Sequence, residues 1–256
     1  MLIHSLINLM HSTSTLIMCI LLFLICMSMI IIFARFLGKE GLYVYSVIAI
    51  ITSNIQVLKA VNLYGFEYPV PLGDMVFTSL FLVGDIITEC WGKEAAQKGI
   101  WLGFAASLMF SIIMLIVVGM QPLSLDSVAD GFFVKSHDAM AMLFTPSFSI
   151  LAASLIAYFV SLWFDVGIFY VMKAALKDKY LWLRSFVSSS IGIIVDVLVF
   201  NILAWIVFTV VSISFDTVMN SYVMNMIKIR IILTICSIPV FYLVKRMVVK
   251  KTIDSI

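Results

Sequence analysis

The sequence has little charge: Asp, Glu, Lys and Arg make up 12% of its 256 residues, whereas 63% are hydrophobic. Its mean hydropathy is correspondingly high, at +1.17. Both values lie far outside the range of soluble domains, so the composition predicts a polytopic membrane protein. The net charge is only +2, which gives no reason to expect a nucleic acid as a partner.

Motifs for several kinds of chemistry are also missing. The sequence contains no HExxH or GxSxG motif, and its four cysteines show no metal-type spacing, so we expect neither an enzyme nor a cofactor. It contains no GxxxxGK[ST] motif either, which indicates that this chain does not hydrolyse ATP itself. An intramembrane aspartyl protease built on Asp165 and Asp196 is the enzymatic alternative. The signature residues expected around each aspartate of such an enzyme are not found.

Hydrophobic stretches long enough to cross a bilayer recur along the chain. They predict an all-α fold, a single integral membrane domain over residues 1–256 with a bundle of about seven transmembrane helices. The predicted spans are about 15–34, 42–61, 72–91, 99–120, 148–172, 185–211 and 226–244. The first is not read as a signal peptide, because it lacks a cationic start and a small-residue cleavage site. The longest predicted loop, 121–146, contains Asp126, Asp130 and His137.

The distribution of Lys and Arg predicts the orientation. With seven spans, twelve of the 16 cationic residues fall on one side, which by the positive-inside rule is cytoplasmic. The N-terminus is therefore expected outside and the C-terminus inside, and the long loop faces outward, where it could cover an entry path. The twelve are Arg35, Lys39, Lys93, Lys98, Lys173, Lys177, Lys179, Arg184, Lys245, Arg246, Lys250 and Lys251.

Several predicted spans contain polar side chains. The most prominent is Asp196, near the middle of the sixth span, where an unpaired carboxylate costs ~2.5–3.5 kcal/mol on insertion scales. We therefore expect it to face a partner or a polar pathway. The others are Asn54 and Gln56 in the second span, Asp85 and Glu89 in the third, and Ser154, Tyr158, Ser161 and Asp165 in the fifth. Hydrogen bonding between helices is the alternative to ligand contact for the amides.

Four segments in order resemble the queuosine precursor transporters, also called the vitamin uptake transporter family. They are FLGKEGLYVYSVIAIITSNIQVLKAV, VGDIITECWGKEAAQKGIWLGF, AYFVSLWFDVGIF and KYLWLRSFVSSSIGIIVD. The resemblance runs from about Phe33 to Lys245. It implies a carrier that brings 7-deazaguanines across the inner membrane: the cyano and aminomethyl precursors of queuosine, or queuine. The lipid bilayer and this small-molecule substrate are thus the implied partners.

The resemblance and the polar pattern together give a set of candidate substrate-binding residues. They are Asn54, Gln56, Asp85, Glu89, Tyr158, Asp165, Arg184, Ser188, Asp196, Phe200 and Arg230. A carboxylate suits the adjacent N–H donors of a deazaguanine edge, an amide suits its O6, and an aromatic ring suits its face. We assign these roles to Asp196 or Asp165, to Asn54 or Gln56, and to Tyr158 or Phe200.

Two departures from the family pattern bear on the substrate. This chain has Leu162 and Ile193 where family members have Gln, which favours a bulkier or less polar 7-substituent and a shift toward queuine. Energy coupling is open. The acids in the spans allow proton coupling, but we favour their pairing with Lys or Arg of neighbouring spans, because intramembrane charges are commonly paired. A homo-oligomer remains open, as does a substrate-binding subunit of a larger importer with separate ATPase partners.

Overall fold

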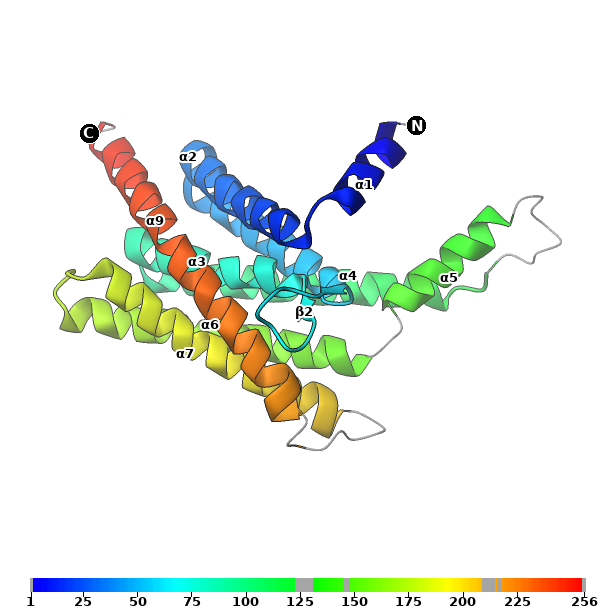
Figure 1. Cartoon of the computed structure of the whole chain (residues 1–256). Helices are drawn as coiled ribbons and strands as arrows, with labels where there is room; N and C mark the ends of the chain where they lie inside the picture. The colour runs from blue at the N-terminus through cyan, green and yellow to red at the C-terminus, as the bar shows by residue number, and fades with distance from the viewer. Residues whose placement is uncertain (1, 123–130, 145–147, 209–214, 216–217, 255–256) are drawn as a thin grey trace.

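The computed structural model describes residues 2–122, 131–144, 148–208, 215 and 218–254, and nearly all of them are helical (Figure 1). The helices are α1 (Leu2–Ser12), α2 (Thr15–Gln56), α3 (Gly73–Trp91), α4 (Lys93–Gly119), α5 (Phe132–Phe144), α6 (Phe148–Ala175), α7 (Leu181–Ile202), the π-helical η2 (Leu203–Val207) and η3 (Val218–Val223), and α9 (Met224–Asp254). Two short antiparallel strands, β1 (Ala60–Val61) and β2 (Val70–Pro71), join α2 to α3.

The long helix α2 consists of two arms that meet at Gly38. Gly38 has φ +63°, a backbone conformation that residues with a Cβ rarely adopt, and the helix is interrupted there. Just beyond the break, a Cβ added to Gly41 would lie 2.5 Å from the carbonyl oxygen of Phe33, so the backbones of the two arms approach closely at the turn. These arms correspond to the first two predicted spans. The second helical arm ends at Gln56, however, and the predicted boundary at Val61 falls in β1.

The centre of the bundle is α3. Fifteen of its 19 residues are buried, and it packs against α2, α4, α6, α7 and α9 (Figure 1). One large hydrophobic core joins these helices, with Ile30 and Ile50 from α2, Phe81 from α3 and Phe169 from α6 among its fully buried members. Thus α3 is the helix around which the polar groups of the bundle are arranged.

Five helices in the described part of the chain are long and apolar enough to cross a membrane: α2, α4, α6, α7 with η2, and α9. The protein is therefore an all-α polytopic membrane protein, as the composition predicts. The broken α2 counts once in this number, and α3 is outside it with Asp74, Asp85 and Glu89 in 19 residues. The total of seven spans stays a prediction.

Other boundaries differ from the sequence-based expectation. The charged stretch before the fourth span is helical, because α4 begins at Lys93 and only Gly92, with φ +90°, separates it from α3. The predicted outer loop contains α5, which includes His137, whereas Asp126 and Asp130 lie outside the described residues. The sixth span begins earlier than predicted, with α7 at Leu181.

Candidate functional site

A cavity of about 110 Å³ lies where one set of helix ends meets, namely the ends of α2, α4, α5 and α7 and the beginnings of α3, α6 and α9. A single water needs about 10–15 Å³, so this space holds a small ligand or several waters. A second cavity, beside Gly84 and Tyr158, measures only about 10 Å³. The larger cavity is therefore the candidate binding site.

One buried cation and two buried acids form part of the cavity wall. Arg230 of α9 donates from Nε and Nη2 to Oδ1 of Asp74, at 3.1 and 2.5 Å, and from Nη1 to Oδ2 of Asp196. Ser161 donates to the other oxygen of Asp196, at 3.2 Å. All three charged residues are buried, and Oδ2 of Asp74 has no hydrogen-bond partner among the described residues. This triad of Asp74, Asp196 and Arg230 carries a net charge of −1.

Aromatic rings line the same cavity. The guanidinium of Arg230 lies over the ring of Phe77, 4.9 Å from its centroid, which stabilises the cation in this position. Phe110, Phe144 and Phe200 also contribute to the wall. The cavity therefore offers flat apolar surfaces next to one buried, partly unsatisfied carboxylate, an arrangement suited to a planar ligand with N–H donors.

An amide completes the polar part of the wall. Asn54, in the last turns of α2, accepts a hydrogen bond from Ser154 of α6 at 2.6 Å and donates to Ser107 of α4 at 3.3 Å. The Asn54 amide thus connects three helices by hydrogen bonds, which is the alternative to ligand contact that the sequence left open. Its side-chain nitrogen has a second N–H, which remains for a ligand.

The family model described as "Putative vitamin uptake transporter" matches residues 71–244, more than half of the chain. The chain belongs to the vitamin uptake transporter family. A curated relative, the "Probable queuosine precursor transporter" of Bacillus subtilis (strain 168), is 26% identical over 220 residues, which cover 86% of this chain and 90% of the relative. No solved structure matches this vitamin uptake transporter.

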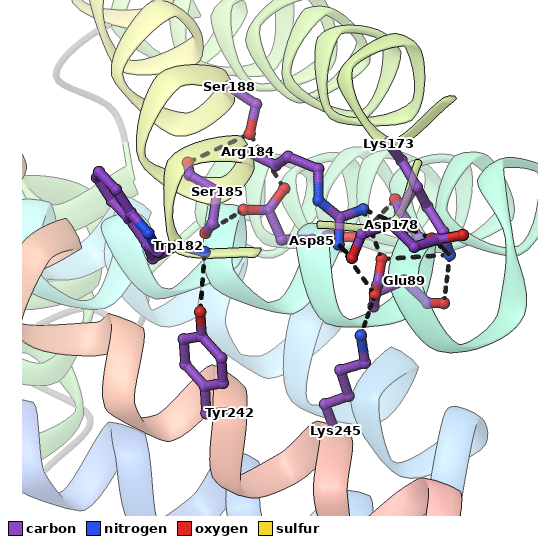
Figure 2. A network of polar contacts seen from close by, with 12 residues as sticks. Asp85, Glu89, Lys173, Asp178, Trp182, Arg184, Ser185, Ser188, Tyr242 and Lys245 are labelled. Carbon is purple, nitrogen blue, oxygen red and sulfur yellow. Dashed lines mark hydrogen bonds and ion pairs between the residues drawn. The ribbon is translucent and has the colours of Figure 1, made fainter. Parts of the chain in front are cut away.

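At the opposite end of α3 from the cavity, the transporter has a cluster of ion pairs around Glu89 (Figure 2). Glu89 accepts from Arg184 at 3.0 and 3.2 Å and from Lys245 at 2.5 Å, and it pairs with Lys173 at 3.2 Å. The cluster therefore joins the end of α3 to α6, α7 and α9. The three cations are among those predicted to lie on one side of the membrane, and they do meet at one end of the bundle. Asp178 lies at the edge of this Glu89 cluster.

Between the cavity and the Glu89 cluster lies a second pair of buried acids, Asp85 of α3 and Asp165 of α6. Asp85 accepts hydrogen bonds from Ser185 at 2.5 Å and from Ser188 and Ser189, each at 3.3 Å. The expected pairing of intramembrane acids with Lys or Arg therefore holds for Glu89, but no ion pair to Asp85 or Asp165 occurs within the described ranges.

The predicted site residues thus fall into separate places. Asn54, Asp196, Phe200 and Arg230 line the cavity; Glu89 and Arg184 belong to the Glu89 cluster; Asp85, Asp165 and Ser188 lie between the two. Tyr158 is buried against Gly103, where an added Cβ would lie 2.1 Å from its hydroxyl oxygen, and it donates to the carbonyl of Ile100. Gln56 ends α2, outside the set of cavity-lining residues. Whether any of them contacts substrate stays a prediction.

Among the residues of the cavity wall that sequence reasoning missed are Asp74 and Phe77. Asp74 lies in the first turn of α3, where an acid is ordinary because it interacts favourably with the helix dipole. The available signal was Arg230, a cation inside the last predicted span with no acid near it in the sequence. A buried arginine requires a carboxylate from another helix.

Proposed function

We propose that this transporter imports 7-deazaguanine compounds, such as the aminomethyl precursor of queuosine or queuine, across the inner membrane for salvage into transfer RNA. Membership of the vitamin uptake transporter family and the name of the Bacillus subtilis relative support the substrate class. The observation that carries the proposal is Asp74, which lines the cavity beside aromatic side chains and has an oxygen with no hydrogen-bond partner among the described residues.

The roles proposed from sequence are revised by the contacts. Both oxygens of Asp196 already accept hydrogen bonds, and Asp165 is not part of the cavity wall. We therefore assign the N–H donors of the deazaguanine edge to the free oxygen of Asp74. The second N–H of Asn54 donates to O6, and Phe200 contacts a face of the ring, a stacking contribution of ~1–3 kcal/mol in comparable nucleobase sites.

Charge favours some deazaguanines over others. The triad of Asp74, Asp196 and Arg230 has a net charge of −1 in a buried wall, so a ligand with a positive charge neutralises it. The aminomethyl compound and queuine each carry an amine that is protonated at neutral pH, whereas the cyano compound is neutral. The expected order of uptake is therefore the two amines before the cyano compound.

The test uses a bacterial host that can neither make nor import queuosine precursors. Trace amounts of each compound are supplied, and queuosine in transfer RNA is measured with the intact protein, with Asp74→Asn, and with Asp138→Asn as the control on an exposed residue of α5. A charge-assisted hydrogen bond contributes ~1.5–3 kcal/mol, so Asp74→Asn should lower uptake about tenfold or more. If no compound yields queuosine although the protein is in the membrane, the proposed function is wrong. Equal uptake by Asp74→Asn would remove this residue from the site.

We also propose that the N-terminus faces outward and the C-terminus faces the cytoplasm. The excess of cations at the end of the bundle with the Glu89 cluster supports this orientation. In this orientation the cavity belongs to the outer half of the bundle, and the Glu89 cluster closes the cytoplasmic half. Reporter fusions that are active only in the cytoplasm, placed after Ile256 and before Met1, test it: activity from the N-terminal fusion would contradict the proposal.

A further inference from the structure

The acid pair Asp85 and Asp165 has an unusual environment for two carboxylates in the middle of a helical bundle. Neither side chain is exposed, and both oxygens of Asp165 lack a hydrogen-bond partner among the described residues. Ser188 and Ser189, which donate to Asp85, also lie close to Asp165. Three hydroxyls therefore donate to the carboxylate of Asp85, whereas the described ranges contain no donor to that of Asp165.

The two charged clusters that flank the pair along α3 are each held by their own ion pairs. On the cytoplasmic side, Glu89 and Asp178 interact with Arg184, Lys173 and Lys245, which leaves that cluster with a net charge of +1. On the cavity side, Arg230 is held by Asp74 and Asp196. With both acids ionised, the Glu89 cluster and the pair together would carry −1. One added monovalent cation makes this group neutral, and burial of an uncompensated carboxylate is strongly unfavourable.

The pair is connected to the substrate cavity through α6. Ser161, which donates to Asp196 in the cavity wall, lies one helical turn before Asp165 on the same face. On the other side, α7 approaches so closely at Gly192 that an added Cβ would lie 3.0 Å from Cβ of Asp165 and 2.7 Å from Cε1 of Phe81. A shift of α6 or α7 on substrate binding would therefore change the surroundings of Asp165.

We infer that Asp85 and Asp165 form a proton-coupling site, in which the pair takes up one proton from the outer side and releases it to the cytoplasm in each transport cycle. The step is a simple exchange: a carboxylate oxygen of Asp165 binds a proton from the outer side, and the same proton later leaves to the cytoplasm. Two carboxylates that share a site commonly hold a single proton between them. This inference rests on the proposed function, because the driven substrate is a deazaguanine.

The experiment uses the purified full chain in liposomes, with the membrane potential clamped. Two assays are compared: counterflow of labelled queuine against unlabelled queuine, which needs no driving force, and net accumulation under an inward proton gradient. One proton per substrate gives about tenfold accumulation per pH unit, because 1.4 kcal/mol corresponds to a factor of ten. A pH-sensitive dye inside the vesicles reports whether added substrate brings protons with it.

Asp165→Asn keeps the shape of the side chain and mimics its protonated form. We expect this variant to retain counterflow, which also shows that it is folded, and to lose both the accumulation and the proton entry. Asp85→Asn should behave in the same way, and Asp138→Asn, an exposed control, should behave like the original chain.

Three results would overturn the inference. Proton-driven accumulation by Asp165→Asn and Asp85→Asn would show that the pair is not the coupling site. Accumulation driven by a sodium gradient at equal pH would identify a different cation, and loss of counterflow in both folded variants would identify a substrate-binding or structural role. Absence of counterflow by the original chain with queuine, and with the aminomethyl and cyano compounds in turn, would instead refute the proposed function and the inference with it.

Discussion

Replacement of Arg230 by Met tests whether the triad is held together by charge. In the structure, three N–H groups of Arg230 donate to Asp74 and Asp196, and its guanidinium lies over Phe77. Charge-assisted hydrogen bonds contribute ~1.5–3 kcal/mol each, and the aromatic contact ~0.5–2 kcal/mol. Desolvation of the three charges offsets much of that sum, so we expect a loss of about 3–5 kcal/mol, typical of breaking a buried pair.

The loss of stability can be measured by titrating the purified protein in mixed micelles with a denaturing detergent. Arg230→Met leaves the carboxylates of Asp74 and Asp196 close together without a cation. In an Asp196→Asn background this repulsion is absent, so Arg230→Met should lower the free energy of unfolding by less. The difference between the two costs is the coupling energy, ~0.5–3 kcal/mol for residues in contact. A loss below about 1 kcal/mol, the usual value for an exposed ion pair, would refute the reasoning, and so would equal losses in both backgrounds.

Two further substitutions test the packing and the ion pairs along α3. Gly192→Ala should destabilise the protein by ~1–3 kcal/mol in the same titration, because the new methyl group would overlap Phe81. The control Gly167→Ala, with nothing within 4 Å of the added Cβ, should leave the stability unchanged. Equal effects of the two substitutions would contradict the close approach of α7. Glu89→Gln removes the acid that pairs with three cations and should loosen this end of the bundle. In a chain without other cysteines, an impermeant maleimide should therefore label Cys90 faster. An unchanged rate of labelling would argue against closure by these ion pairs.

The general architecture could be predicted from composition and hydrophobic length alone. The clustering of cations at one end was also predictable, because each predicted span reverses the chain direction, and Lys173, Arg184 and Lys245 do meet at Glu89. The positions of the helix ends were harder to predict from the sequence. The break at Gly38 and the single-residue separation at Gly92 depend on positive φ angles, which a glycine permits but does not require.

The candidate site could be predicted only in part. Asp196 was recognised because an acid in the middle of an apolar stretch is costly, and Arg230 through the resemblance to the family. Their direct contact could not be predicted, because it depends on how α7 and α9 pack around α3. Asp74 was missed for the same reason: its importance arises from its burial and from the cation opposite, and neither is visible in the local sequence.

The three acids of α3 explain why so charged a helix lies at the centre of a membrane protein. With a rise of 1.5 Å per residue, Asp74 and Asp85 are about 16 Å apart along the axis, and Glu89 is about 6 Å further. Within the described part of the chain, Asp74 interacts with one arginine and has one oxygen without a hydrogen-bond partner, Glu89 pairs with three cations, and Asp85 accepts hydrogen bonds from serine hydroxyls alone. The ion pairs therefore hold α3, α6, α7 and α9 together at one end of the bundle, and the cavity lies at the other end. Both α6 and α7 contribute residues to the Glu89 cluster and to the cavity wall. We therefore expect a movement of either helix at one end to change the surroundings of Asp85, which lies between the two ends.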